Sequence, residues 1–238
     1  MRLDRAAALS GFTRAEAKRA VASGRVRVQG AVIRDAAMQV DPADVSVDGV
    51  RVQAGEVYVM VHKPAGVLTA TEDKRLPTVA DLLPEPIKKR SPGPVGRLDR
   101  DVTGLVIMTT AGQLAHRLIS PNWKAEKVYR AWCEGRLTAE DAARFAGGVA
   151  LSDFTARPAG LSIIVADDAG SVADVTLTEG KFHQVKRMFA AVGHPLDRLH
   201  RLRIGCVTLD DALAPGDCRP LTEEEVAGLH RLCGMDDQ

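Results

Sequence analysis

The order of strand-like and helix-like segments along the chain limits the folds that it can adopt. Apolar stretches predict strands at 57–61, 105–109, 127–134, 161–165 and 173–178. Periodic or capped stretches predict helices at 79–83, 112–119, 139–146, 183–192 and 222–229. These segments do not alternate as regularly as a doubly wound parallel sheet requires. The order therefore favours an α+β domain with a mixed, mostly antiparallel sheet.

The first 52 residues have the pattern of a separate, small α/β unit. A helix should begin at Thr13, because Thr13 and Glu16 have the spacing of a capping box and Gly24 supplies a stop. A tight hairpin is expected at Asp48-Gly49. The other elements expected here are a short helix at 3–9 and strands at 25–29, 31–33, 45–47 and 50–52. A new apolar strand starts near residue 57, so we predict domains at residues 1–56 and 57–238.

A proline-rich segment carries a run of positive charge. Pro84, Pro86, Pro92 and Pro94 surround Lys88-Lys89-Arg90. Proline fixes its backbone and lacks an N–H group. This segment is therefore predicted to be an irregular, basic loop.

Charge is distributed unevenly along the chain, although the net charge is only +1. Residues 1–34 hold eight Arg and Lys against two acids, whereas the last 35 residues hold two Arg against eight acids. Arg14 and Lys18 share one helix face, and Arg25 and Arg27 alternate outward on a strand. Such a basic surface suits a phosphate backbone, although a solvated helix face gives the same pattern.

Several classes of protein and site do not fit this sequence. No apolar stretch reaches the roughly 20 residues of a membrane span, and no leader opens the chain, so we expect a soluble, cytoplasmic protein with no membrane association. The four cysteines form no C-x-x-C pair, which argues against a disulfide framework and a thiolate zinc site. We expect no metal, and we expect His183, His194 and His200 to be ordinary helix and loop histidines.

The motifs of the chain carry a resemblance to a known family. The segments Arg2-Leu-Asp-Arg, Thr13-Arg-Ala-Glu-Ala-Lys and Gly24-Arg-Val-Arg-Val-Gln-Gly30 resemble an S4 RNA-binding domain. Four later motifs are similar to those of the RsuA and RluA types of pseudouridine synthase: Lys63-Pro-Ala-Gly66, Gly96-Arg-Leu-Asp-Arg-Asp-Val-Thr-Gly-Leu105, Glu126-Lys-Val-Tyr129 and Glu179-Gly-Lys-Phe-His-Gln-Val-Lys-Arg-Met-Phe189. Lys186, where the RluA type has arginine, favours the RsuA branch and a target in small-subunit ribosomal RNA.

The resemblance implies a cofactor-free isomerisation of one uridine to pseudouridine, with Asp99 as the catalytic carboxylate. A lone aspartate in a loop is more often a turn or capping residue, and the motif around Asp99 is what favours catalysis. Asp101 is the nearest competitor, and it is expected to face solvent or to fix the turn.

The family's other site residues have alternatives of their own. Lys186 is expected to pair with Asp99 and keep it ionised, although it also suits a solvated helix. Lys186 and Arg187 diverge by about 100° on a helix, so only one should face the site. Tyr129 would stack on the uracil and assist the C5 proton, unless it is a core tyrosine. Arg97 would either position the flipped nucleotide or brace its own loop.

The implied partner is ribosomal RNA of the small subunit or its assembly intermediate, bound by a monomer through basic residues. Those expected to contact phosphate are Arg14, Lys18, Arg25 and Arg27 on the N-terminal side, and Lys88, Lys89, Arg90, Arg201 and Arg203 near the cleft. An aromatic content of 4% argues against broad stacking platforms.

Two other functions stay open on the sequence. One is a synthase that acts on large-subunit RNA, and the other is a non-catalytic S4-type RNA-binding or ribosome-assembly protein. The latter would need the basic N-terminus but not Asp99, Tyr129 and Lys186 together. The sequence names neither the target uridine nor its timing in assembly, nor whether Asp99 acts first as nucleophile or as base.

Overall fold

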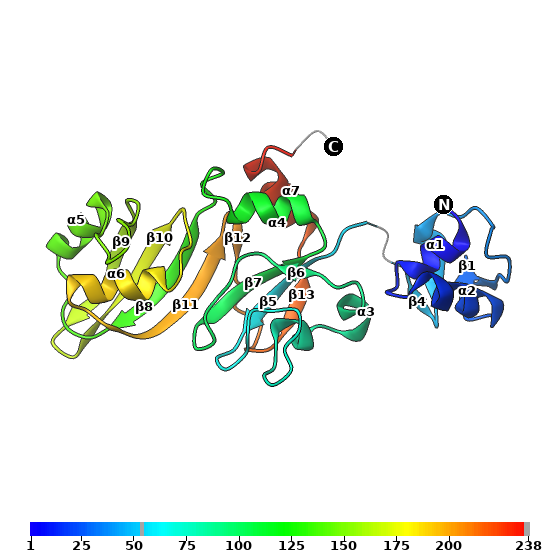
Figure 1. Cartoon of the computed structure of the whole chain (residues 1–238), viewed down its shortest axis with the longest axis horizontal. Coiled ribbons are helices and arrows are strands. Elements are labelled where there is room, and N and C mark those ends of the chain that lie inside the picture. Colours follow the sequence, from blue (N-terminus) through cyan, green and yellow to red (C-terminus); the bar gives the residue numbers. More distant parts are fainter. Residues whose placement is uncertain (53–54, 236–238) are drawn as a thin grey trace. The chain divides into compact units, whose positions relative to one another are not determined.

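The computed structural model describes residues 1–52 and 55–235. The chain divides into two compact units, the smaller made of Met1–Val57 with Leu83–Pro92 and the larger of Tyr58–Leu82 with Gly93–Gln238. Figure 1 shows the elements of each. The division of roles between residues 1–56 and 57–238 stays a prediction.

Within the smaller unit, residues 1–52 form two helices and a small sheet. Helices α1 (Leu3–Ala8) and α2 (Arg14–Ala22) precede β1 (Val26–Val28), β2 (Ala31–Val32), the 3-10 turn η1 (Pro42–Asp44), β3 (Val45–Val47) and β4 (Val50–Arg51), and the sheet has the order β2-β1-β3-β4. The predicted capping box is confirmed, since the Thr13 backbone N–H donates to the Glu16 carboxylate at 2.8 Å. The hairpin is confirmed too, because Asp48 and Gly49 both have positive φ angles, 51° and 84°.

The proline-rich segment differs from the prediction of an irregular loop. It holds a short helix, α3 (Glu85–Lys88), and a short strand, β6 (Gly93–Pro94), which pairs with β7 (Thr103–Thr109). Pro84 precedes the helix and Pro86 lies in its first turn, where no intrahelical N–H donor is needed. Proline thus begins this helix rather than preventing it.

The larger unit is built on one mixed sheet, and the predicted α+β class is confirmed. Its main order is β13-β5-β7-β11-β8-β10-β9, with β12 paired to β11 and β6 to β7. Every pairing is antiparallel except that of β11 with β7. The strands not yet bounded are β5 (Tyr58–Lys63), β8 (Lys127–Cys133), β9 (Gly160–Asp167), β10 (Gly170–Leu177), β11 (Leu196–Ile204), β12 (Val207–Thr208) and β13 (Cys218–Pro220).

Strand β11 lies inside this sheet but was not predicted. Its sequence, Leu-Asp-Arg-Leu-His-Arg-Leu-Arg-Ile, is too polar for a buried strand. Leu199, Arg201 and Ile204 are nevertheless buried, and the Arg201 Nε donates to the Leu105 carbonyl at 2.7 Å. His200 lies in this strand too, so its expected place in a helix or loop was wrong.

The helices pack at two places on the sheet (Figure 1). Helices α4 (Gly112–Ile119) and α7 (Glu223–Leu232) share a core with β5, β7 and β12, formed by residues such as Met60, Leu105, Leu118 and Leu229. Helices α5 (Ala139–Gly147) and α6 (Gln184–Val192) meet through an edge-to-face contact of Phe145 and Phe189. The helices predicted at 112–119, 139–146, 183–192 and 222–229 are confirmed. At 79–83 the chain forms a 3-10 helix instead, η2 (Val79–Leu82).

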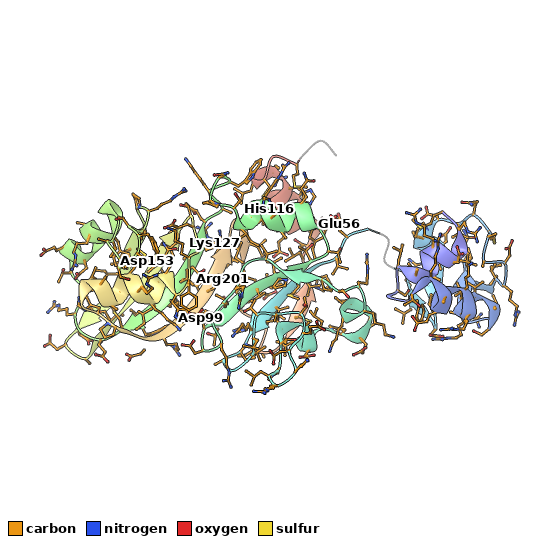
Figure 2. All side chains as sticks on the ribbon, in the orientation of Figure 1. Glu56, Asp99, His116, Lys127, Asp153 and Arg201 are labelled. Atoms are coloured by element: carbon orange, nitrogen blue, oxygen red, sulfur yellow. The ribbon has the colours of Figure 1, made fainter. Side chains whose placement is uncertain are left out.

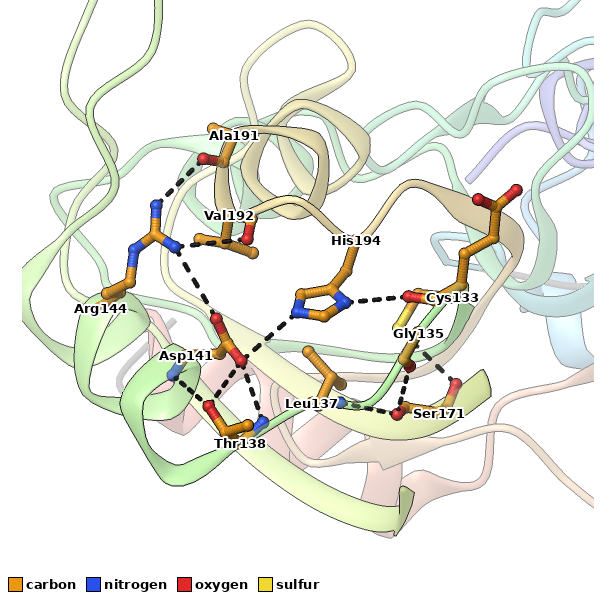
Figure 3. Close-up of polar contacts among 11 residues, drawn as sticks. Cys133, Gly135, Leu137, Thr138, Asp141, Arg144, Ser171, Ala191, Val192 and His194 are labelled. Atoms are coloured by element: carbon orange, nitrogen blue, oxygen red, sulfur yellow. Dashed lines mark hydrogen bonds and ion pairs between the residues drawn. The ribbon is translucent and has the colours of Figure 1, made fainter. Parts of the chain in front are cut away.

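The C-terminal end of α6 is fixed by a polar network (Figure 3). Arg144 of α5 donates to the carbonyls of Ala191 and Val192 at 3.1 and 3.3 Å. His194, which follows α6, bonds through Nδ1 to the Glu134 carbonyl at 2.9 Å and lies 3.4 Å from Asp141. Helix α6 is therefore held firmly at this end, and its other end faces the site described next.

Candidate active site

A cleft in the larger unit brings together the family's motif residues. Its wall includes Arg97, Asp99, Tyr129 and Lys186, which come from a loop before β7, from β8 and from α6. Asp99 and Arg201 both lie near the middle of the larger unit (Figure 2). Residues separated by almost 90 positions in the sequence thus share one small, polar space.

Buried polar contacts fix the loop that carries Asp99. The Lys63 ammonium is fully buried and donates to the carbonyls of Pro64, Arg100 and Val102 at 3.0, 3.1 and 2.7 Å. Burial lowers the pKa of Lys63 to about 8. The Thr69 hydroxyl donates to the Leu98 carbonyl at 2.8 Å and accepts from the Leu98 N–H at 3.1 Å. Asp99 therefore sits between two anchored points of backbone.

Each carboxylate oxygen of Asp99 has its own basic partner. Lys186 Nζ lies 3.2 Å from Oδ2, so the predicted pairing of these residues is confirmed. His183 Nε2 lies 3.3 Å from Oδ1. Two contacts on opposite oxygens restrict the rotation of the carboxylate and fix its orientation in the cleft.

Asp101 does more than face solvent. Its side chain is 72% exposed, yet both of its oxygens accept from Lys186 at 2.8 Å. Burial would lower the pKa of Lys186, but its hydrogen bonds to Asp101 and Asp99 leave that pKa raised. The hydrogen bond from Lys186 lowers the pKa of Asp101. Lys186 is thus held as a cation by two carboxylates.

His183 is the site residue that sequence reasoning missed. It is the N-cap of α6 with a left-handed backbone, φ +51°, and so precedes Lys186 by one helical turn. The next residue, Gln184, ties this turn together. Its side-chain Nε2 donates to the buried Glu179 carboxylate at 2.7 Å, and its side-chain Oε1 accepts from the Lys181 backbone N–H at 2.9 Å. The sequence signal that could have identified His183 was its place in the motif at 179–189.

Only one of the two adjacent basic residues of α6 faces Asp99, as predicted. Arg187 turns to the other side, where it pairs with Asp153 and donates to the Ser152 hydroxyl at 3.1 Å. Its guanidinium also lies 5.2 Å from the centroid of the Phe154 ring. Lys186 alone of the pair lines the cleft.

Tyr129 is both a buried strand residue and part of the cleft wall, and its expected stacking on uracil stays a prediction. It is buried in β8 with 8% of its surface exposed, and it also lines the cleft. The Arg201 guanidinium carbon lies 5.9 Å from the centroid of its ring. The ring is therefore well fixed at the wall of the cleft.

Arg201 does not lie on the surface, so its predicted role as a phosphate contact is wrong. It is 2% exposed, and its Nη2 has no hydrogen-bond partner among the described residues. It pairs across the sheet with Gly104, and a Cβ there would lie 2.3 Å from the Arg201 carbonyl oxygen. Glycine at 104 allows the two strands to approach closely and enclose the arginine.

The other predicted RNA contacts are at the surface. Arg14, Lys18, Arg25, Arg27 and Arg97 are all exposed. Arg25 is paired with Asp48 at 2.9 Å, and Arg27 donates to the Gly30 carbonyl at 2.9 Å. Among the remaining predicted contacts, Lys89 is exposed, whereas Lys88, Arg90 and Arg203 are half-buried. Arg203 pairs with Glu126 at 2.8 Å. Their contact with RNA stays a prediction.

Comparisons with known proteins agree with this geometry. A family model described as RNA pseudouridylate synthase matches residues 57–191, and an S4 domain model matches residues 1–46. YtzG of Bacillus subtilis, called an uncharacterized RNA pseudouridine synthase, is 44% identical over 98% of both chains. The ribosomal small subunit pseudouridine synthase A of Escherichia coli is 44% identical over 96% of this chain and 100% of the relative. A crystal structure of a pseudouridylate synthase matches with a TM-score of 0.68 and 34% identity over 96% of this chain and 99% of that one.

The match covers nearly the whole chain, and its motifs meet in one cleft, so the resemblance seen in the sequence is confirmed. The chain belongs to the RNA pseudouridine synthases of the RsuA type, which carry an N-terminal S4 domain.

Proposed function

We propose that this enzyme isomerises one uridine of small-subunit ribosomal RNA and that Asp99 carries the reaction. The observation behind the chemistry is the Asp99 carboxylate, with Lys186 on one oxygen and His183 on the other. The observation behind the substrate is the 44% identity to enzymes named ribosomal small subunit pseudouridine synthase A. Lys186 at the basic position of the last motif supports the same branch.

The reaction breaks the bond between N1 of uracil and C1′ of ribose and forms a bond between C5 and C1′. C5 loses its proton and N1 gains one, so no atom is gained or lost overall. Asp99 acts beside C1′, as nucleophile or as base, while positive charge develops on the sugar. The Lys186 ammonium lies against the Asp99 carboxylate and supplies a positive charge beside it in the cleft. Tyr129 supports the uracil ring and assists the C5 proton.

The target base must leave its stack to reach this cleft, which costs a few kcal/mol. Arg97, exposed at the cleft wall, helps to hold the flipped nucleotide. Arg14, Lys18, Arg25 and Arg27 bind phosphates from the S4 side and help to offset that cost. We assign RNA binding to residues 1–56 and catalysis to residues 57–238, in a monomer that works in the cytoplasm.

No helix of the described residues combines the length and the apolar composition of a membrane span.

Mapping of pseudouridine in total ribosomal RNA tests the substrate. We expect cells without the enzyme to lose pseudouridine at one small-subunit position, and purified enzyme to restore it on RNA from those cells. Loss at a large-subunit position instead would favour the within-family alternative. Unchanged maps with an expressed enzyme would contradict the proposed substrate.

A further inference from the structure

One apolar ring stands unusually far into solvent beside the active site. Phe182 is 76% exposed, more than any other large apolar side chain that the structure describes. Exposing a phenyl ring forgoes the free energy of burying it. A ring that is left in water next to a catalytic cleft therefore requires an explanation.

The Phe182 ring is stacked on His183. The ring centroids are 3.8 Å apart, and the planes are inclined by 18°. The same histidine lies 3.3 Å from Oδ1 of Asp99 through its Nε2. One face of the phenyl ring is thus covered by a residue of the active site, and the high exposure places the other face in solvent.

The turn that carries the two rings is fixed before any ligand binds. Gln184 is buried and holds the turn by accepting from the Lys181 N–H and donating to Glu179. His183 takes the left-handed conformation that this turn requires. A pre-organised ring loses little entropy when something stacks on it.

The surroundings of Phe182 select the kind of ligand. Lys186 and Arg187 follow it by four and five positions but are both paired with carboxylates, which leaves Lys181 as its basic neighbour in the chain. The Lys181 ammonium lies 3.6 Å from the centroid of the Phe154 ring, and no carboxylate of the described residues forms a salt bridge with it. A flat apolar face beside positive charge suits a base attached to a phosphate backbone better than an apolar protein surface.

From this arrangement we propose that Phe182, backed by His183, is a stacking subsite for one unpaired RNA base next to the target uridine. The proposal rests on the proposed function, because it assumes that RNA enters the cleft of Asp99. A phenyl ring stacks on any of the four bases, so the subsite adds affinity rather than sequence specificity.

A uridine-free RNA tests the subsite separately from catalysis. The probe is an unpaired oligoribonucleotide of adenosine and cytidine that contains 2-aminopurine, whose fluorescence falls on stacking and which the enzyme has no uridine to modify. With the full-length enzyme we expect quenching on binding, and the same in Phe182→Tyr. Phe182→Leu should bind on the order of 5- to 100-fold more weakly and quench less. Trp123→Leu, which removes another partly exposed aromatic ring, is the matched control and should bind like the wild type.

Small-subunit ribosomal RNA supplies the second readout. In single-turnover reactions Phe182→Leu should need a higher RNA concentration for half-maximal rate, by a similar factor, and should approach the wild-type rate at saturation. A leucine variant that equals the wild type in both assays would overturn the subsite, as would equal weakening by Trp123→Leu. A wild-type enzyme that binds the uridine-free RNA through Phe182 but makes no pseudouridine in small-subunit ribosomal RNA would instead refute the proposed function.

Discussion

At the scale of single residues, the arrangement of charge around Asp99 makes its partners separable by mutation. Lys186 contacts Asp99 and Asp101, so Lys186→Met removes the cation from both carboxylates. We expect the single-turnover rate at saturating RNA to fall by about 100-fold or more, as in the loss of a positioned catalytic partner. Lys186→Arg should keep part of the activity, because it retains the charge with a different donor geometry. A lysine that only bound phosphate would instead leave this rate unchanged and lower the salt dependence of binding.

His183 offers a finer test of how the carboxylate is oriented. His183→Asn removes the contact with Oδ1, while asparagine still tolerates the left-handed backbone at this position. The rate at saturating RNA should fall by only about 10-fold, because Lys186 still provides a positive charge beside Asp99. The melting temperature should stay near that of the wild type, which distinguishes lost orientation from lost folding. An unchanged rate would show that Oδ1 needs no partner.

At the scale of elements, the parallel pair of β7 and β11 contains a half-buried histidine whose titration is predictable. His200 of β11 lies 2.7 Å through Nδ1 from the Thr103 hydroxyl of β7. Burial, followed by the charge of His62, lowers the pKa of His200 to about 4 from 6.5. Between these values the unfolded chain binds a proton that the folded chain does not, so stability falls as the pH drops from 6.5 to 4. The whole change is about 3 kcal/mol.

His200→Gln should remove this part of the pH dependence. Urea unfolding of wild type and variant at pH 7, 5.5 and 4.5 measures it, and the difference between the two should shrink or reverse as the pH falls. Parallel stability curves for the two proteins across this range would show that His200 does not titrate in this way.

The same elements show which features the sequence can predict. The sequence predicts a feature correctly where residues a few positions apart determine the structure. The Thr13 capping box and the Asp48-Gly49 turn are two such features. Strand β11 was missed because its buried arginine is accommodated by a carbonyl of β7 and by the glycine opposite, which no local pattern reveals. Arg201 was placed on the surface for the same reason.

The candidate site also contains residues that the sequence predicts and contacts that it does not. The motifs supplied Asp99 and Lys186, since both stand at fixed places in segments that resemble the family. The pairing of His183 with Asp99 depends instead on a tertiary approach of two loops, and the sharing of Lys186 with Asp101 does too. Spacing along the chain carries no information about such contacts.

At the scale of the whole molecule, the two units predict separable functions. The sheet and core of the larger unit lie within the described residues from Tyr58 onward, so removal of residues 1–54 should leave a folded enzyme. Its affinity for RNA should drop, because Arg14, Lys18, Arg25 and Arg27 are lost. Circular dichroism checks folding, and binding at several salt concentrations should show a smaller salt slope. A truncated enzyme that binds and modifies its target as well as the full chain would refute the assigned role of the S4 domain.

Single-turnover formation of pseudouridine by Asp99→Asn tests most directly whether Asp99 carries the reaction. Asparagine has nearly the same shape but lacks the reactive carboxylate, so RNA binding and folding should change little. With RNA labelled with tritium at C5 of uridine, the wild type should release the label and form pseudouridine. Asp99→Asn should do neither, while Asp101→Asn should remain active because Lys186 keeps its contact with Asp99. Release of tritium by Asp99→Asn at a rate near that of the wild type would show that Asp99 does not carry the reaction.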